Sequence, residues 1–323
     1  MSLLRQTKAY EWELQAQVQS RAVGNVATPD IVSEHAHMNS SNYKILFPVD
    51  FSNRSISAVE HVSLWRRQFG ASLETVHIVD NQRYESRYDH SMYSELSRVV
   101  ARRTADLEYF CLHQFGKDVA HAIVLAGSRA DQLEHLVNRE QIDLIMLPRN
   151  HQSFISKFLG DSVAAILLER CTASVWMTEH LEEHHAVTVN NVLCAMHFKQ
   201  GPTLDAQNFR ILEMVRQLVI NFGAEVTFQQ VTGNAESGKS GSAAGTEAGS
   251  QLWMAQARDL LGSSKKLLRR PGKVISGIRE TAHEIGADLV VVGRMRPEAI
   301  SFGRQSRILK IDHAVRCPVL SVW

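Results

Sequence analysis

The chain contains one segment whose residue types and spacing match a phosphate-binding loop. Residues 233–250 read GNAESGKSGSAAGTEAGS, in which Gly233 is followed after four residues by Gly238, Lys239 and Ser240. In nucleoside triphosphatases the N–H groups of such a loop bind phosphate, and the loop leads directly into a helix. Here the residues that follow continue a Gly/Ser-rich run, which is typical of a flexible linker. We therefore expect no nucleoside triphosphatase site at this segment.

The histidines could supply acid–base or metal-binding chemistry, but their spacing favours neither. The segment 178–190 contains His180, His184 and His185, and a metal site there is the alternative to the solvated linker that its polar composition indicates. His197 follows an apolar strand and has no partner in a triad order, so a surface histidine is favoured over an acid–base group. We expect no catalytic residue and no metal site.

The overall charge is close to balanced. With 35 Lys and Arg residues against 34 Asp and Glu residues, the 323-residue chain has a formal net charge of +1. This balance provides no general attraction to nucleic acid or to an anionic membrane. The four cysteines form no CxxC pair, and no run of about 18 apolar residues occurs, which argues against a zinc site, a disulfide framework and a membrane span. We expect a cytoplasmic protein that binds neither nucleic acid nor membrane, and its length favours two domains.

The chain repeats one order of apolar strands and amphipathic helices. The strand pattern of 43–52 recurs at 190–198, and a helical stretch that ends in Phe-Gly-Ala follows both. IDLIMLP at 142–148 recurs as ADLVVVG at 287–293, and each half closes with a helix and an apolar strand. Near-continuous apolar strands that alternate with helices indicate parallel strands buried on both faces. The repeat predicts an α/β fold of two tandem Rossmann-like domains, each a five-stranded parallel sheet covered by helices on both faces.

The repeat also sets the expected domain boundaries. The first domain covers 42–179 and the second covers 190–323, and a linker at 180–189 joins them. Residues 1–41 are polar and are expected to form a loose N-terminal extension, while 233–250 is a Gly/Ser-rich insertion in the second domain. The closing strand of each half is too apolar to leave an unpaired edge in water, so each needs a neighbouring strand.

A ligand crevice is expected at the carboxyl ends of the strands, where the strand order of an open parallel sheet reverses. In each half it is bordered by the ends of the first and fourth strands and by the start of the last helix, whose free N–H groups suit a phosphate. The bordering residues are Asp50, Pro148 and Ser162 in the first half and His197, Gly293 and Ser306 in the second. Asp50 has two interpretations, a ligand-binding carboxylate or a cap of the following helix.

These residues and motifs resemble a tandem member of the universal stress protein family. In that family a strand ending in V-P-x-D-x-S opens the domain, and FPVDFS matches it through Pro48, Asp50 and Ser52. The resemblance extends over 43–178 and 190–323, and it implies HUP-type Rossmann-like domains. It also implies that the last strands of the two domains pair within the chain, which gives a pseudo-twofold monomer and leaves a homodimer open.

The resemblance further implies a nucleotide loop after the fourth strand. In ATP-binding members this loop reads Gly-x-x-Gly, nine residues, then Gly-Ser or Gly-Thr. In the first half Pro148, His151 and Asp161 stand at the three glycine positions before Ser162. Proline has no N–H donor, and a carboxylate at a helix start repels phosphate. We expect that the first domain does not hold a triphosphate.

The second half departs from the loop pattern differently. Gly293 remains, Arg296 stands at the second glycine, and Ser306 falls at the Ser position. His197 replaces the Asp that contacts adenine in the family. Four arginines could collect an anion, although arginines of a surface loop are usually only solvated: Arg294, Arg296, Arg304 and Arg307. ATP or AMP in the second domain is the cofactor that this pattern leaves open.

We therefore expect a non-catalytic binding or regulatory module of the stress response that acts through an unidentified protein partner. The stress role rests wholly on the resemblance, because a fold alone does not determine a function. The first alternative is an adenine-nucleotide-binding sensor that uses only the second domain. The second alternative is slow ATP hydrolysis in one half, for which the sequence contains no visible general base.

Overall fold

The structure is a computed structural model. The residues that it describes are 43–80, 90–148, 163–178, 187–196, 206–232, 251, 253–255, 257–259, 261, 266–294 and 307–323. Ser41–Trp323 form one compact unit. The predicted extension at 1–41 and the predicted insertion at 233–250 lie outside the described residues, and so does most of the predicted linker at 180–189. The domain boundaries therefore stay predictions.

Strands and helices alternate along both halves of the chain. The elements of the first half are β1 (Lys44–Pro48), α2 (Asn53–Phe69), β2 (Ser72–Val79), α4 (His90–Phe115), β3 (Ala120–Ala126), α5 (Arg129–Glu140), β4 (Leu144–Pro148), α6 (Val163–Arg170) and β5 (Ser174–Thr178). Those of the second half are β6 (Asn191–Met196), α7 (Ala206–Phe222), β7 (Glu225–Thr232), β8 (Lys266–Pro271), α9 (Val274–Glu284), β9 (Leu289–Gly293), α10 (Arg307–Ala314) and β10 (Val319–Val322).

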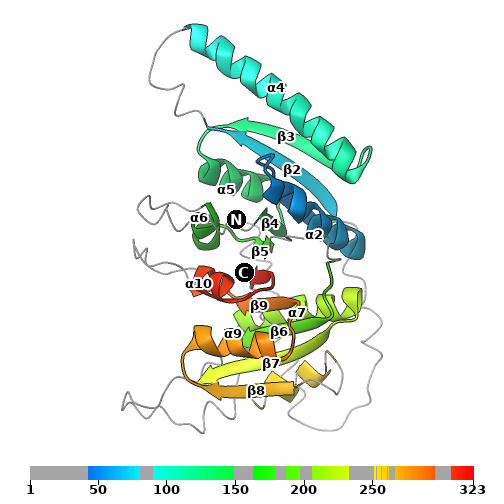
Figure 1. Cartoon of the computed structure of the whole chain (residues 1–323), viewed down its shortest axis with the longest axis vertical. Helices are drawn as coiled ribbons and strands as arrows, with labels where there is room; N and C mark the ends of the chain where they lie inside the picture. Colours follow the sequence, from blue (N-terminus) through cyan, green and yellow to red (C-terminus); the bar gives the residue numbers. More distant parts are fainter. Residues whose placement is uncertain are drawn as a thin grey trace, which may run out of the picture. The chain divides into compact units, whose positions relative to one another are not determined.

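The ten strands form one sheet in the order β3-β2-β1-β4-β5-β10-β9-β6-β7-β8 (Figure 1). Neighbouring strands within each half pair in parallel. The last strands of the halves, β5 and β10, pair antiparallel and join the two runs of five. This topology confirms the prediction of two tandem Rossmann-like domains connected through their last strands.

Equivalent hydrogen bonds relate the two halves residue by residue. The carboxylate of Asp143, just before β4, accepts a hydrogen bond from the N–H of Lys44 at 2.8 Å. The carboxylate of Asp288, just before β9, accepts one from the N–H of Asn191 at 2.9 Å. Each bond fixes the start of the first strand of its half against the start of the fourth. Lys44 and Asn191 are therefore equivalent, and counting across the paired strands gives the other equivalences.

The same counting locates the internal pseudo-twofold axis. Leu144 and Leu289 are equivalent, because they lie opposite the equivalent residues Ile45 and Val192. Trp176 lies opposite Met146, two residues after Leu144, and Leu320 lies opposite Val291, two residues after Leu289. Trp176 of β5 and Leu320 of β10 are therefore equivalent. Trp176 and Leu320 also lie opposite each other in the antiparallel pair. An axis that relates two equivalent strands must pass between such a pair, so it passes between these two residues.

The repeated Phe-Gly-Ala motif ends the first helix of each half. Gly70 and Gly223 adopt left-handed backbone conformations with φ of 60° and 67°, which glycine tolerates without a Cβ clash. The N–H of Gly70 donates to the carbonyl of Arg66, and the N–H of Gly223 donates to that of Val219. This turn directs the chain straight into the second strand of each half.

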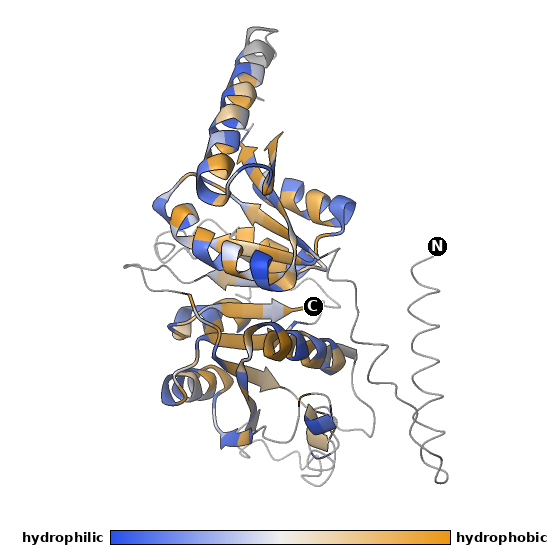
Figure 2. Cartoon of the chain, turned by 90° about the vertical axis from the view of Figure 1, so that its right-hand side faces the viewer, coloured by the Kyte–Doolittle hydropathy of each residue, from blue (hydrophilic) through white to orange (hydrophobic). Residues whose placement is uncertain are grey.

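Helices cover both faces of the sheet, and a hydrophobic core fills each side. One core includes buried residues of α2, α4 and α7 and the other includes residues of α5, α6, α9 and α10. Figure 2 shows hydrophobic residues on the sheet and on the helix sides that face it. The first core also joins the halves, since Trp65 of α2 lies 4.8 Å from Trp176 and 5.8 Å from Phe222 of α7, ring centroid to centroid.

Of the helices that the structure describes, none combines the length and hydropathy of a membrane span. The described residues also contain no group of three or more His, Cys, Asp or Glu side chains placed to hold a metal ion. All four cysteines are buried, and none of them forms a disulfide.

Candidate functional site

The expected ligand crevices lie at the carboxyl ends of β1 and β4 and of β6 and β9. Of the candidate ligand-binding residues, the structure describes Asp50 and Gly293. The other four lie outside the described residues: Ser162, His197, Arg296 and Ser306. The geometry of the two strand ends can therefore be compared through Asp50 in the first domain and Gly293 with its successor Arg294 in the second.

The carboxylate of Asp50 is bonded within its own loop. Its Oδ1 atom accepts hydrogen bonds from the N–H of Ser52 at 2.9 Å and from the hydroxyls of Ser52 and Ser55. The hydroxyl of Ser55 also accepts a hydrogen bond from the N–H of Asp50 at 3.1 Å. These bonds fix the turn before α2 and account for the Oδ1 atom, but the N-cap residue is Ser52 and no side chain caps α2 by a hydrogen bond, so the capping interpretation of Asp50 is wrong. The carboxylate itself stays exposed at 53% of its side-chain surface.

The surroundings of Asp50 keep it ionised. Partial burial raises the pKa of its carboxyl. The hydrogen bonds from Ser52 and Ser55 and the guanidinium of Arg54 lower this pKa by more than burial raises it, so it lies below the ordinary value. Arg54 Nη2 lies 3.9 Å from Asp50 Oδ2. An anionic ligand near this carboxylate would be repelled, and a ligand that donates hydrogen bonds would compete with two serine hydroxyls.

A side chain of the protein fills the space beside Asp50. Phe51 has a left-handed backbone with φ of 60°, which is uncommon for a residue with a Cβ. Its ring lies 4.7 Å from the ring of His77 and 6.2 Å from that of Phe110, and the guanidinium of Arg103 lies 5.5 Å from its centroid. The end of β1 is thus packed by an aromatic ring on the side of β2 and α4.

His77 supports this packing and was missed from the sequence. Its Nδ1 atom lies 2.7 Å from the carbonyl oxygen of Val49, and because a carbonyl can only accept, Nδ1 carries the proton. Burial is the main cause that lowers the pKa of His77, so the ring is neutral at pH 7. No residue pattern predicts this pair, because the partner is a backbone atom just past the end of β1.

In the second domain Gly293 ends β9 and is exposed, while the next residue turns inward. The N–H of Arg294 donates to the carbonyl of Val322 at 2.8 Å. Its guanidinium donates to the carbonyls of Leu167 at 2.9 Å, Leu168 at 2.7 Å and Ala173 at 2.5 Å. Only 4% of Arg294 is exposed.

These contacts correct the expectation that Arg294 collects an anion. The carbonyls of Leu167 and Leu168 belong to the last turn of α6, where the helix dipole is negative, and the carbonyl of Leu167 also accepts a hydrogen bond from the N–H of Cys171 at 3.0 Å. Burial lowers the pKa of Arg294 to about 10, so the side chain remains charged at pH 7. Arg294 therefore uses its charge to join the second domain to the end of a helix in the first.

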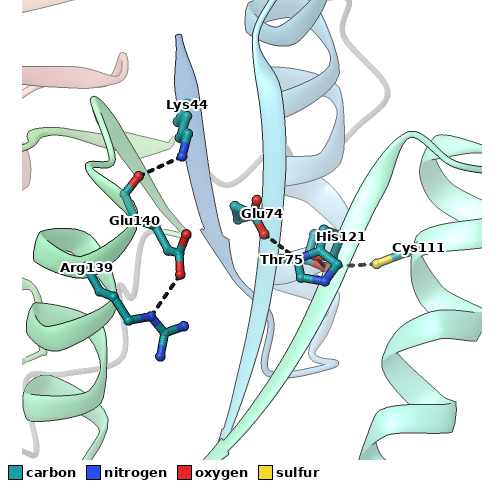
Figure 3. A network of polar contacts seen from close by, with 7 residues as sticks. All are labelled: Lys44, Glu74, Thr75, Cys111, His121, Arg139 and Glu140. Carbon is teal, nitrogen blue, oxygen red and sulfur yellow. Dashed lines mark hydrogen bonds and ion pairs between the residues drawn. The ribbon is translucent and has the colours of Figure 1, made fainter. Parts of the chain in front are cut away.

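Hollows in the described surface lie at the other end of the strands. A groove of about 400 Å³ is lined by Glu74, His121, Ala122, Ile123, Val124, Arg139 and Glu140. Figure 3 shows its ion pairs: His121 Nδ1 lies 2.7 Å from Glu74 Oε2, and Arg139 Nε lies 2.8 Å from Glu140 Oε1. Lys44 Nζ donates to the backbone carbonyl of Glu140 at 2.9 Å. The charged rim is thus paired within the protein.

Comparison with known proteins agrees with this fold. Residues 42–179 match the model of the universal stress protein family. A universal stress protein from Archaeoglobus fulgidus DSM 4304 has a TM-score of 0.61 at 17% identity, over 88% of this chain and 99% of that chain. A protein of unknown function from Pseudomonas aeruginosa PAO1 has a TM-score of 0.57 at 14% identity, over 88% of this chain and 93% of that chain. None of the curated proteins compared with the chain matches it.

At these identities the structural likeness shows the fold, and it extends over both halves. The family is carried by the match over 42–179, which includes FPVDFS with Asp50 and Ser52. The first domain, over residues 42–179, therefore belongs to the universal stress protein family, and the second half shares the fold of these structures.

Proposed function

We propose that the chain is a cytoplasmic, non-catalytic binding or regulatory module of the stress response that acts through a protein partner. The observation that carries this proposal is the state of Asp50, at the position that contacts adenine in nucleotide-binding relatives. Its Oδ1 atom is already bonded to Ser52 and Ser55, and the ring of Phe51 packs beside it against His77. A nucleotide that used Asp50 Oδ1 in the first domain would have to disrupt the bonds that fix the turn before α2.

Thermal unfolding with added ATP, AMP or cyclic AMP tests this proposal. A ligand that binds only the native state, present at about 100 times its Kd, stabilises it by about 2.7 kcal/mol. We expect that no nucleotide raises the melting temperature by binding to the first domain. Wild type and Asp50→Ala should therefore show the same change in melting temperature with each nucleotide. An increase with ATP that Asp50→Ala abolishes would overturn the proposal.

An adenine-nucleotide sensor in the second domain is the second candidate function. It is favoured by Gly293, which is exposed at the end of β9 where the first domain has Pro148 at the end of β4. A glycine admits a phosphate close to the backbone, whereas proline has no N–H to offer. The same titration distinguishes the candidates: an ATP-dependent shift that Asp50→Ala retains and Ser306→Asp removes would establish the second.

Under this proposal the chain does not catalyse ATP hydrolysis. Incubation with magnesium and ATP should release phosphate no faster than the buffer alone. If release depends on magnesium and disappears in Lys239→Ala, the Gly/Ser-rich segment is a working phosphate loop and the non-catalytic proposal is wrong. Arg279→Ala, on the exposed surface of α9, is a control for unspecific effects of removing a cation.

A further inference from the structure

The ten-stranded sheet has two terminal strands, β3 and β8, which are equivalent in the two halves. Val79 of β2 and Thr232 of β7 are equivalent, and they lie opposite Ala126 and Pro271. Ala126 and Pro271 are therefore equivalent, and the rest of β3 and β8 can be aligned by counting back from them. A terminal strand presents backbone N–H and C=O groups that another strand can bind. How each strand is built therefore decides whether its edge can accept a partner.

Strand β8 carries residues that oppose pairing, whereas β3 does not. The residues of β8 that serve this purpose are Lys266, Arg269, Arg270 and Pro271. The equivalent residues of β3 are His121, Val124, Leu125 and Ala126. Charged side chains and proline on an edge strand are the usual means by which sheets avoid adding strands. The sequence thus blocks one edge of the sheet and leaves the other apolar.

The outward backbone groups of β3 can be assigned from its bonds to β2. The N–H of Gly127 donates to the carbonyl of Val79 at 2.9 Å, so Gly127 directs its N–H towards β2. In a parallel pair, alternate residues of a strand direct their N–H and C=O groups to the same neighbour. When residues are counted back from Gly127, the N–H and C=O groups of Ala126, Val124 and Ala122 point away from β2.

A groove borders β3 on the face of the sheet that α5 covers, since Glu74 of β2 and Arg139 and Glu140 of α5 also line it. It is lined by four consecutive strand residues, 121–124, although consecutive side chains point to opposite faces. Such a lining includes the backbone of the strand as well as its side chains. His121, which forms the rim of the groove with Glu74 (Figure 3), is itself exposed at 71% of its side chain.

We propose that β3 is a homodimer interface, at which the β3 strands of two copies pair antiparallel and continue the sheet. The chain already joins two sheets in this way, since the equivalent strands β5 and β10 pair antiparallel about Trp176 and Leu320. The closing strand of each half is apolar and finds its partner within the chain. Strand β3 is a second apolar edge, and a second copy supplies its partner.

The sequence of β3 suits pairing with itself. Antiparallel pairing centred on Ile123 places Ala122 opposite Val124 of the second copy, and both residues direct their hydrogen-bonding groups outwards. In that register Ala122 and Val124 of the two copies form hydrogen-bonded pairs, which use the backbone groups that point away from β2. His121, the only ionisable residue of the strand, lies opposite Leu125 and not opposite another histidine. No like charges face each other across the interface.

A reciprocal exchange of edge residues tests the proposal on the full chain. In the first variant, Val124→Arg with Ala126→Pro gives β3 the residues of β8. In the second, Arg269→Val with Pro271→Ala gives β8 those of β3. The measurement is the mass in solution by sedimentation, from about 1 to 100 µM protein, the range in which a micromolar Kd becomes visible. Wild type should approach twice the 36.3 kDa chain mass, and the first variant should remain at it.

The second variant should associate at least as strongly as wild type and form larger assemblies, because both edges are then open. A wild type that keeps the mass of one chain over the whole range would overturn the proposal, as would a first variant that dimerises like wild type. Ala126→Pro alone, at the end of β3, is the milder variant if Val124→Arg reduces stability, and thermal unfolding checks that each protein is folded.

Hydrogen exchange gives a measurement that needs no substitution. The amides of 122–126 should exchange more slowly at high than at low protein concentration, while those of 267–270 in β8 should not change. Equal exchange of the 122–126 amides at both concentrations would contradict the proposal. None of these outcomes depends on nucleotide binding, so the interface and the proposed function can fail separately.

Discussion

The two halves share a fold, yet they use the polar residues at their strand ends differently. In the first domain Asp50 bonds Ser52 and Ser55, so its contacts stay within its own loop. In the second, Arg294 extends to carbonyls of α6 in the other half. The two residues are not equivalent in the repeat, since Asp50 follows the first strand of its half and Arg294 follows the fourth strand of the other, but both lie at carboxyl strand ends, where related folds bind ligands. One has become part of the internal structure of its half, and the other has become part of the junction between the halves.

The first helices of the two halves show a second difference. His61 of α2 and Met214 of α7 are equivalent, since Phe69 and Phe222 end the two helices at the same motif. His61 is 2% exposed, and the described residues give neither ring nitrogen a hydrogen-bond partner. A titratable group thus occupies, in one half only, a core position that is apolar in the other.

The largest effect is expected from removing the contact between the halves at Arg294. Arg294→Met keeps an unbranched apolar side chain but leaves three buried carbonyls without their charged donor. We expect a loss of about 3 kcal/mol of unfolding free energy, since each such bond contributes about 1.5 to 3 kcal/mol and the relief of burying a charge offsets part of the sum. Urea unfolding measures it.

Arg279→Met, on the exposed face of α9, is the matched control and should change stability by less than about 0.5 kcal/mol. If Arg294→Met costs no more than this control, the guanidinium does not stabilise the junction and the contrast between the two strand ends disappears.

The next effect depends on pH and concerns His61. Burial lowers its pKa to about 4 from an ordinary 6.5, so the unfolded state binds more protons between these two values. Stability from this group is complete above pH 6.5 and is lost as the pH falls towards 4, by about 2 kcal/mol at pH 5. His61→Met, which copies Met214 of the second half, should remove this loss.

The measurement is the unfolding free energy of wild type and His61→Met from pH 7.5 to pH 4.5. Ser57→Ala, which changes no titratable group, is the control and should keep the pH dependence of wild type. Parallel curves for wild type and His61→Met would contradict a buried neutral histidine.

The fold could be predicted from the sequence because its signals are local and occur twice. Apolar runs such as those of β1 and β6 and the Phe-Gly-Ala turns at Gly70 and Gly223 depend on nearby residues only. Fewer features of the site than of the fold could be predicted from the sequence. The capping role that was one of the two interpretations of Asp50 is wrong, because Ser52 is the N-cap residue and Asp50 bonds Ser52 and Ser55 in the turn before α2.

The role of Arg294 could not be expected, because its partners lie more than 120 positions away and are backbone carbonyls, which every residue carries. The same holds for His77, whose partner is the carbonyl of Val49. Four candidate residues, Ser162, His197, Arg296 and Ser306, lie outside the described residues and stay predictions.

A smaller effect is expected within the loop of Asp50. Ser55 is fully buried, and Ser55→Ala removes its bond to the carboxylate and its bond to the N–H of Asp50. We expect a loss of about 1.5 kcal/mol, the typical cost of removing a buried hydrogen-bonding group with a charged partner. Ser57→Ala, whose exposed hydroxyl donates to the carbonyl of Asn53, is the control and should cost much less. Equal losses would show that the Asp50 network is no stronger than a surface contact.

The smallest effect concerns a feature that the halves share. Gly70→Ala and Gly223→Ala each force a residue with a Cβ into a left-handed conformation, so each should lower the unfolding free energy by about 1 kcal/mol. The ring centroids of Phe69 and Phe222 lie 5.9 Å apart, so the two turns follow side chains of one core. Thermal unfolding of both variants should therefore give equal decreases in melting temperature. A clearly unequal pair would mean that the two halves differ in their basic turns as well as in their strand ends, and that the repeat has diverged further than Asp50 and Arg294 indicate.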